Sequence, residues 1–148
     1  MLFTLLLVAT LAEAAQGPAV PAPSTASQAA ELEAAGRYDE ALAAFQRLAA
    51  ANPNDHRVRL AIARLHMNMG HPDRAEAVYG SVMNEDGSNL DAILGVADAR
   101  MAQWRYEDAL EVLERAEKLA PENPMVLAKL GRTHQEVGRS RLAVAYLQ

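Results

Sequence analysis

The side chains best suited to acid–base or metal chemistry in this chain are its histidines. Imidazole titrates near neutral pH and is a common metal ligand, so a histidine cluster would indicate a catalytic or metal centre. The spacing argues against such a cluster, since His56 and His66 are ten residues apart and do not form the i, i+4 pair of a helical zinc site. The four candidates are His56, His66, His71 and His134.

Other catalytic signals are missing from the sequence as well. The chain contains no G-x-S-x-G, no P-loop and no dinucleotide fingerprint, and with no cysteine it offers neither a thiol nucleophile nor a zinc–thiolate site. A formal charge of -5, from 14 basic and 19 acidic residues, argues against a nucleic-acid partner. We therefore predict a protein without enzymatic activity, cofactor, metal or small-molecule substrate.

Composition indicates which elements must position any functional side chain. The 148 residues are 51% apolar, yet they include two Phe, four Tyr and one Trp. A core of Ala, Leu, Val and Met is typical of helices, so the sequence predicts one all-α domain.

The first residues have a composition of their own. Residues 2–11 form an apolar run about half as long as a membrane-spanning helix, and Ala12-Glu13-Ala14 follows as a small-x-small pattern. We predict a signal peptide at 1–14, cleaved after Ala14, a Pro/Ala-rich linker at 15–23, and export to a bacterial periplasm or cell envelope. No Lys or Arg precedes the run, which leaves an uncleaved apolar tail that packs on or anchors the domain as the alternative.

A period of 34 residues runs through the rest of the chain. Small residues recur in two columns, bulky apolar residues follow the second column four positions later, and glycine or tryptophan precedes it by five. Where helices cross closely, a side chain larger than Ala or Gly would hold the backbones apart, so we assign the small columns to repeat packing. The columns are Ala29, Ala63, Ala97 and Gly131; Ala41, Ala75, Ala109 and Ala143; Phe45, Tyr79, Leu113 and Leu147; and Gly36, Gly70, Trp104 and Gly138.

Capping residues fit the same register. Thr25 with Gln28 resembles a capping box, and His71-Pro72-Asp73 is expected to open another helix. N-caps are also expected at Asn54-Asp55, Ser88-Asn89 and Asn123-Pro124. The sequence predicts helices over 25–35, 38–51, 56–69, 72–84, 90–103, 106–119, 124–137 and 140–148.

The pattern of small residues, turn glycines and unit-ending Pro53 and Pro121 resembles the tetratricopeptide repeat. The resemblance implies an all-α, right-handed α-solenoid of antiparallel helix pairs (TPR superhelix) over 24–148. Its units are 22–55, 56–89, 90–123 and a truncated 124–148. His66 and His134 occupy equivalent places two units apart, too far to share one metal.

Three features depart from the family pattern. The column Leu32, His66, Arg100 and His134 is more polar than usual, and Gly87 replaces the unit-ending proline in the second unit. Trp104 stands where the family has the turn glycine. If that turn needs a positive φ, we expect strain and a different local geometry.

The resemblance also implies a groove lined by the first helices, which would bind an amphipathic helix or an extended peptide of a partner. The alternative is that the row Arg64, Asp98 and Arg132 is a solvated ladder of salt bridges and the Leu and Met residues are half-buried core. The lysine and asparagine of the carboxylate-clamp type are missing, with Leu60 and Arg64 at those positions, so we do not expect a chaperone tail. The groove residues implied are Arg57, Leu60, Arg64, Met67, Asn68, Asp91, Leu94, Asp98, Met101, Ala102, Met125, Ala128, Arg132, Gln135 and Glu136.

The last unit stops midway through its second helix, which predicts an apolar patch around Leu142, Val144, Ala145 and Leu147. Two hypotheses follow. The chain is an exported interaction scaffold with protein or peptide partners, or it is the N-terminal periplasmic spacer of a larger outer-membrane, export or polysaccharide-secretion protein. The exposed C-terminal helix would serve self-association or continuation of the stack.

Overall fold

The computed structural model describes residues 25–147, which fold into eight helices with no strand in that range. Each observed helix end lies within one residue of its predicted position. The predicted leader and linker lie outside the described residues. The helices are α1 (Ala26–Ala34), α2 (Tyr38–Ala51), α3 (His56–Asn68), α4 (Pro72–Glu85), α5 (Leu90–Ala102), α6 (Tyr106–Leu119), α7 (Pro124–Glu136) and α8 (Ser140–Leu147).

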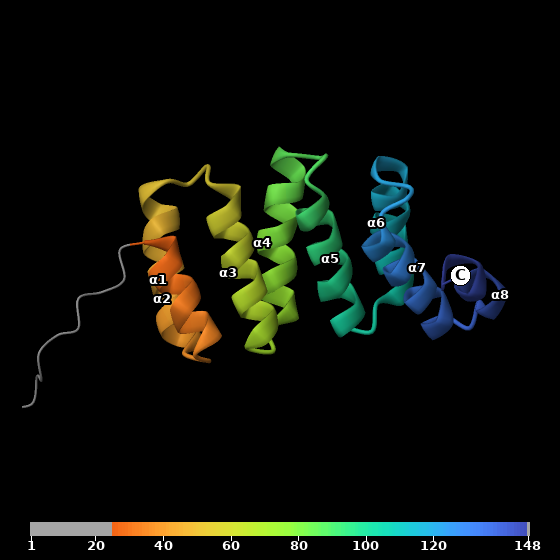
Figure 1. Cartoon of the computed structure of the whole chain (residues 1–148), viewed down its shortest axis with the longest axis horizontal. Helices are drawn as coiled ribbons and strands as arrows, with labels where there is room; N and C mark the ends of the chain where they lie inside the picture. Colours follow the sequence, from red (N-terminus) through yellow and green to blue (C-terminus); the bar gives the residue numbers. More distant parts are fainter. Residues whose placement is uncertain (1–24, 148) are drawn as a thin grey trace, which may run out of the picture.

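The helices stack in sequence order along the long axis of the molecule, as Figure 1 shows. Each helix packs against the next one in the chain, and α3 also contacts α5, so that first helices of successive pairs are neighbours. Short turns join the members of each pair and make them antiparallel. The fold is an all-α solenoid.

Side-chain caps fix where the first helix of each pair begins. Asp55 accepts a hydrogen bond from the Arg57 backbone N–H, and Asn89 and Asn123 act in the same way at α5 and α7. Thr25 caps α1 by accepting from the Gln28 N–H at 3.3 Å. His71 is the N-cap of α4 but its side chain makes no capping hydrogen bond, so Pro72 and Asp73 supply the local preference there.

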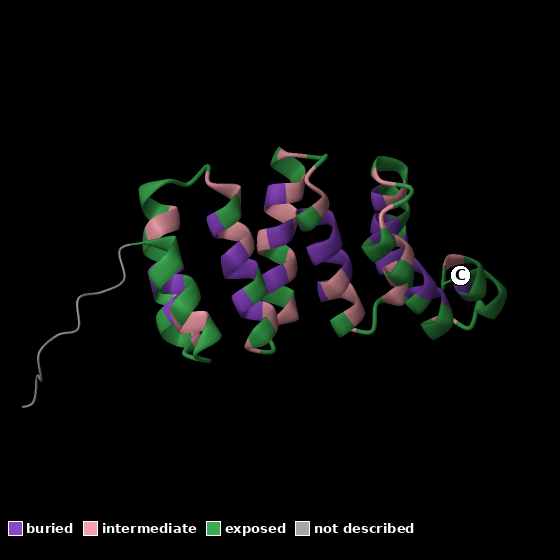
Figure 2. Cartoon of the chain, viewed as in Figure 1, coloured by how far each residue is buried: buried purple, intermediate pink, exposed green. Residues whose placement is uncertain are grey.

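The small-residue columns lie in the helix contacts. Ala41, Ala75 and Ala109 are fully buried, and Ala143 is 4% exposed. In Figure 2 buried segments recur in the helices along the stack, and the buried residues form two clusters, one around α1–α3 and one from α3 to α7. A larger side chain at these sites would have to push two backbones apart.

The turns inside the pairs share one backbone conformation. Gly36, Gly70 and Gly138 have φ between 73° and 75°, and Trp104 has φ 63°. The expectation of a different geometry at Trp104 is therefore wrong. The Trp104 N–H donates to the Met101 carbonyl, and the Arg105 N–H donates to the Arg100 carbonyl, as at the glycine turns. These hydrogen bonds end the helix and require a left-handed backbone conformation at this position.

The last helix leaves an apolar surface in the open. Leu142, Val144 and Leu147 are about half exposed, whereas Ala143 between them is buried against α7. Within the described range, no helix combines the length and apolar character needed to cross a membrane.

Candidate functional site

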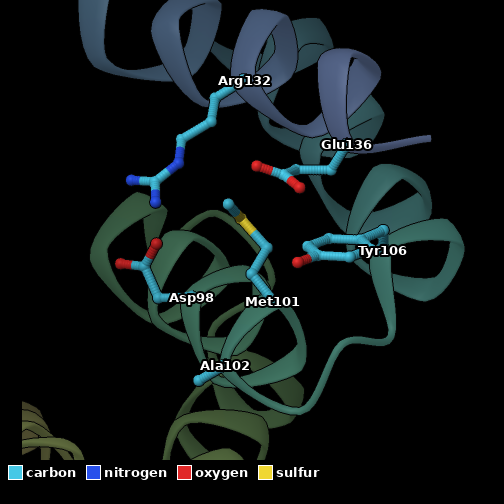
Figure 3. Close-up of a pocket in the computed structure, with 6 residues that line it drawn as sticks. All are labelled: Asp98, Met101, Ala102, Tyr106, Arg132 and Glu136. Carbon is cyan, nitrogen blue, oxygen red and sulfur yellow. The ribbon is translucent and has the colours of Figure 1, made fainter. Parts of the chain in front are cut away.

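Two adjoining pockets lie on the face formed by α3, α5 and α7. The central pocket has a volume of about 330 Å³, and the distal pocket, drawn in Figure 3, has a volume of about 240 Å³. Asp98 lines both, so they form one groove. The central pocket is lined by Leu60, Arg64, Tyr79, Asp91, Leu94, Gly95, Asp98, Met125 and Lys129, and the distal pocket by Asp98, Met101, Ala102, Tyr106, Arg132 and Glu136.

Many of the residues implied by the repeat resemblance line this groove, but not all of them. Arg57 is bound to Asp55, Asn68 donates to Glu33, and Met67 packs on the core. Ala128 and Gln135 also lie outside both linings. The remaining ten line the groove: Leu60, Arg64, Asp91, Leu94, Asp98, Met101, Ala102, Met125, Arg132 and Glu136.

Tyr79 enters the groove from α4, the second helix of its pair. An added Cβ on Gly95 would lie 2.4 Å from the Tyr79 ring, so the absence of a side chain at Gly95 makes room for the phenol to cross α5. Tyr79 is 9% exposed and lines the central pocket. Phe45 and Leu113 occupy the same column of the repeat but have no polar atom in their side chains, so the hydroxyl is specific to the second unit.

The charged side chains at the centre of the groove are paired across successive helix pairs. Arg64 donates to Glu33 of α1 at 2.6 and 2.8 Å, and Lys129 of α7 pairs with Asp98 of α5. In the predicted row of Arg64, Asp98 and Arg132, the first two side chains are thus paired with residues outside the row and not with each other. Both pairs stay partly exposed, so each contributes at most about 1 kcal/mol to stability.

Three other charges of the groove are free. Asp91, Arg132 and Glu136 form no ion pair with any residue of the described part of the chain. In Figure 3 the guanidinium of Arg132 extends on the side of Asp98, while the carboxylate of Glu136 lies on the side of Tyr106. The groove therefore keeps uncompensated polar groups around an apolar floor.

Burial and charge both act on the Tyr79 hydroxyl. Burial raises its pKa, Arg64 opposes that rise, and Asp98, Glu33 and Asp91 add to it. The phenol is thus protonated at neutral pH and can both donate and accept a hydrogen bond. It makes no hydrogen bond to the residues of 25–147.

The histidines lie apart from this groove. His66 and His134 are buried, and the Nδ1 atom of each lacks a hydrogen-bond partner. The His66 and His71 rings are 6.5 Å apart, and His134 stacks on Tyr146 at 5.5 Å. His56 contacts Glu85 at 3.1 Å. Among the residues described, no three His, Asp or Glu side chains gather in a way that could hold a metal ion.

Lys129, Gly95, Tyr79 and Tyr106 are groove residues that the sequence did not single out. Gly95 is a glycine in the middle of a helical pattern, which can signal a close approach of another group. Tyr79 carries the only hydroxyl in the bulky column of the second helices. Lys129 and Tyr106 carry no comparable signal.

The curated proteins that this chain resembles are much longer than the chain itself. Human Protein O-mannosyl-transferase TMTC1 is 30% identical over 95 residues, covering 64% of this chain and 11% of that protein. Mouse Tetratricopeptide repeat protein 21A is 27% identical over 111 residues, covering 75% of this chain and 8% of that one. The chain spans about a tenth of the length of these relatives.

Solved structures show the same fold. A thermophilic TPR protein of Thermus thermophilus has a TM-score of 0.73 and 25% identity, covering 81% of this chain and 68% of that one. The first TPR of Spaghetti (RPAP3), bound to the HSP90 peptide SRMEEVD, has a TM-score of 0.70 and 21% identity, covering 76% and 89%. A model of the tetratricopeptide repeat family matches residues 32–95 and 70–133. Since the two matches extend over most of the chain, this protein belongs to the tetratricopeptide repeat family.

Proposed function

We propose that the chain is a non-enzymatic protein-interaction scaffold that binds a peptide or helix of a partner in the groove. The observation that carries the proposal is the pair of pockets joined at Asp98, which together form an elongated site with an apolar floor and a polar rim. Such a site suits several consecutive side chains of one segment. The structural neighbour bound to an HSP90 peptide shows that this fold can hold a peptide.

The groove is built on rigid elements with an adaptable surface. Leu60 and Leu94 form part of a floor that the core supports from behind, and Met101 and Met125 can adjust to different partner side chains. Rigid helices lower the entropy lost by the scaffold on binding. We expect the affinity to depend on a few central residues, as in other interfaces.

A peptide library displayed on phage and selected on the purified chain tests this function. We expect selected peptides whose binding is lost or weakened at least tenfold by the charge reversals Arg64→Glu and Asp98→Arg. Glu111→Gln is the matched control, because Glu111 of α6 is exposed, makes no ion pair within the described range and lines neither pocket. Selected peptides that bind all groove variants as well as the wild type would place the site elsewhere.

The second candidate is the spacer of a larger envelope protein. The exposed apolar residues of α8, Leu142, Val144 and Leu147, favour it because another helix packed there would remove them from water. Appending the residues encoded downstream of Gln148 should then protect α8 amides from hydrogen exchange. Unchanged protection would leave the scaffold as the better account.

We also propose export to a bacterial periplasm or cell envelope, supported by the apolar run 2–11 and the small-x-small pattern Ala12-Glu13-Ala14. Cell fractionation followed by N-terminal sequencing tests the proposal. Mature protein beginning at Ala15 in the periplasmic fraction is the expected result, and uncleaved protein beginning at Met1 in the cytosol would refute it.

A further inference from the structure

The two pockets of the groove repeat one set of side chains. The central pocket contains Tyr79, Met125 and Asp91, and the distal pocket contains Tyr106, Met101 and Glu136. Each set consists of a phenol, a thioether and a carboxylate. Figure 3 shows the distal set, with Met101 in the middle of the pocket and Tyr106 and Glu136 together on one side of it.

The polar members of these sets lack partners in the described part of the chain. Neither Asp91 nor Glu136 is in an ion pair with any residue of 25–147, and the hydroxyls of Tyr79 and Tyr106 make no hydrogen bond there. Tyr79 is the more informative, because its side chain is nine-tenths buried and reaches the central pocket. Its oxygen stays accessible from the pocket, so water or a ligand there can supply the hydrogen bonds that residues 25–147 do not.

The unpaired charges of the groove are negative on balance, because the two carboxylates of Asp91 and Glu136 are opposed by the single guanidinium of Arg132. Arg64 is neutralised by Glu33, and Lys129 is neutralised by Asp98. The guanidinium of Arg132 extends on the Asp98 side of the distal pocket, away from Tyr106. Asp91 in the central pocket and Glu136 in the distal pocket remain as acceptors for a cation.

We propose that the groove selects an extended peptide with two basic residues, whose Lys or Arg side chains occupy the central and distal pockets. The proposal rests on the peptide-binding function proposed above and names the chemistry of the partner. Each aliphatic stem would pack on methionine and on a tyrosine ring, and each cationic head would reach a carboxylate and a phenol oxygen.

The positions of the two carboxylates set the spacing of the basic residues. Glu136 on α7 is equivalent in the repeat to Ala102 on α5, which is eleven residues after Asp91. Eleven residues of helix correspond to about 16 Å along the axis. An extended peptide covers that length in about five residues. The step across from α5 to α7 lengthens the path, so we expect basic side chains at least about five positions apart.

Fluorescence anisotropy with synthetic peptides tests the proposal on the full chain. The probe is an alanine- and serine-based peptide with two lysines five positions apart, and the matched peptides replace both lysines by norleucine or by glutamate. We expect the lysine peptide to bind at least tenfold more tightly than either, with an affinity that falls as salt rises. A lysine peptide with a two-residue spacing should bind less tightly.

Variants of the chain then locate the selectivity. Asp91→Asn and Glu136→Gln should each reduce the preference for lysine over norleucine severalfold, and the double variant should abolish it. Tyr79→Phe removes the hydroxyl and keeps the ring against Gly95, so it should weaken lysine binding without affecting norleucine. Glu111→Gln and Tyr38→Phe, which lie outside both pockets, should change nothing.

The possible outcomes separate this proposal from the function on which it rests. If library-selected peptides bind the groove but carry apolar or acidic residues there, the basic preference is wrong and the scaffold function stands. The preference is also wrong if Asp91→Asn and Glu136→Gln leave the ratio of lysine to norleucine affinities unchanged. If neither the library nor the lysine peptide yields binding at the groove, both proposals fail. Circular dichroism of each variant establishes that it is folded.

Discussion

The middle and the end of the stack contain the same sequence pattern in different surroundings. Leu113 of α6 and Leu147 of α8 occupy the same column of the repeat, yet Leu113 is fully buried and Leu147 is 57% exposed. The difference is that α7 packs against α6, while no described helix follows α8. A repeat column therefore specifies which side chain faces the neighbouring unit, and burial depends on whether that neighbour is present.

Truncation of these two leucines should show the largest contrast. Leu113→Ala removes a fully buried side chain and leaves a cavity between α5, α6 and α7, which should lower the free energy of unfolding by about 2 to 5 kcal/mol. Leu147→Ala should lower it by about 0.5 kcal/mol or less, as for an exposed site. Urea denaturation followed by circular dichroism measures both. Equal effects would mean that the end of the stack is covered in solution.

Enlargement of the small positions should distinguish the same two regions less strongly. Ala109→Leu places extra volume in a fully buried helix contact, and overpacking of this kind costs about 1 to 3 kcal/mol. Ala145→Leu adds the same volume on the exposed part of α8, where the change should stay within about 0.5 kcal/mol. Thermal denaturation of both variants gives the comparison. An Ala109→Leu protein as stable as the wild type would contradict close helix contact at this column.

Much of this fold follows from the sequence because its signals are local or periodic. A cap such as Asn89 fixes the start of α5, the 34-residue columns fix which alanines meet, and the two together predict helix ends to within one residue. Trp104 shows the limit of reasoning from residue preference alone. The hydrogen bonds that end α5 require a left-handed residue, and the chain adopts that conformation without a glycine.

The groove is less predictable because its contacts join residues of different units. Tyr79 reaches the groove only because Gly95, on the next helix, leaves space for its ring. Similarly, Asp98 pairs with Lys129 and not with the predicted Arg132, since the length and direction of each side chain decide the partner. A repeat pattern assigns positions to faces and carries no information about these pairings.

Ion pairs test the contrast between the middle and the end of the stack with smaller expected effects. Glu76 accepts hydrogen bonds from Arg100, Gln103 and Arg105, and its side chain is 20% exposed. Arg139, the repeat equivalent of Arg105, pairs with the mostly exposed Glu107 at 3.3 Å. Glu76→Gln should cost about 1 to 2 kcal/mol at neutral pH because charged hydrogen bonds in a half-buried site are lost. Glu107→Gln should cost about 0.5 kcal/mol or less.

The cost of Glu76→Gln should depend on pH. Burial raises the pKa of Glu76, but hydrogen bonds from Arg100 and Gln103 and the charges of Arg105 and Arg100 outweigh burial and leave the pKa below its ordinary value of 4.5. The unfolded chain therefore binds a proton before the folded one as the pH falls. Stability from the Glu76 carboxylate is complete above the unfolded pKa and is lost as the pH falls through the folded pKa. Denaturation of wild type and variant between pH 7 and pH 3 should show the gap closing in acid, and a constant gap would contradict this account.

The turns should give the smallest effect. At Gly138, near the end of the stack, Gly138→Ala places a side chain on a residue in the left-handed conformation and should lower the free energy of unfolding by about 1 kcal/mol.

At Trp104, in the middle of the stack, Trp104→Gly relieves a similar backbone strain. The same change raises the conformational entropy of the unfolded chain and removes an edge-to-face contact with Tyr106 at 6.1 Å. Because Trp104 is 79% exposed, little buried area is lost, and we expect stabilisation of less than about 1 kcal/mol. Circular dichroism is used to follow the unfolding of both variants, because Trp104 is the sole tryptophan and Trp104→Gly removes the fluorescent probe. Destabilisation by Trp104→Gly of more than about 1 kcal/mol would mean that the ring contributes packing that its exposure does not suggest.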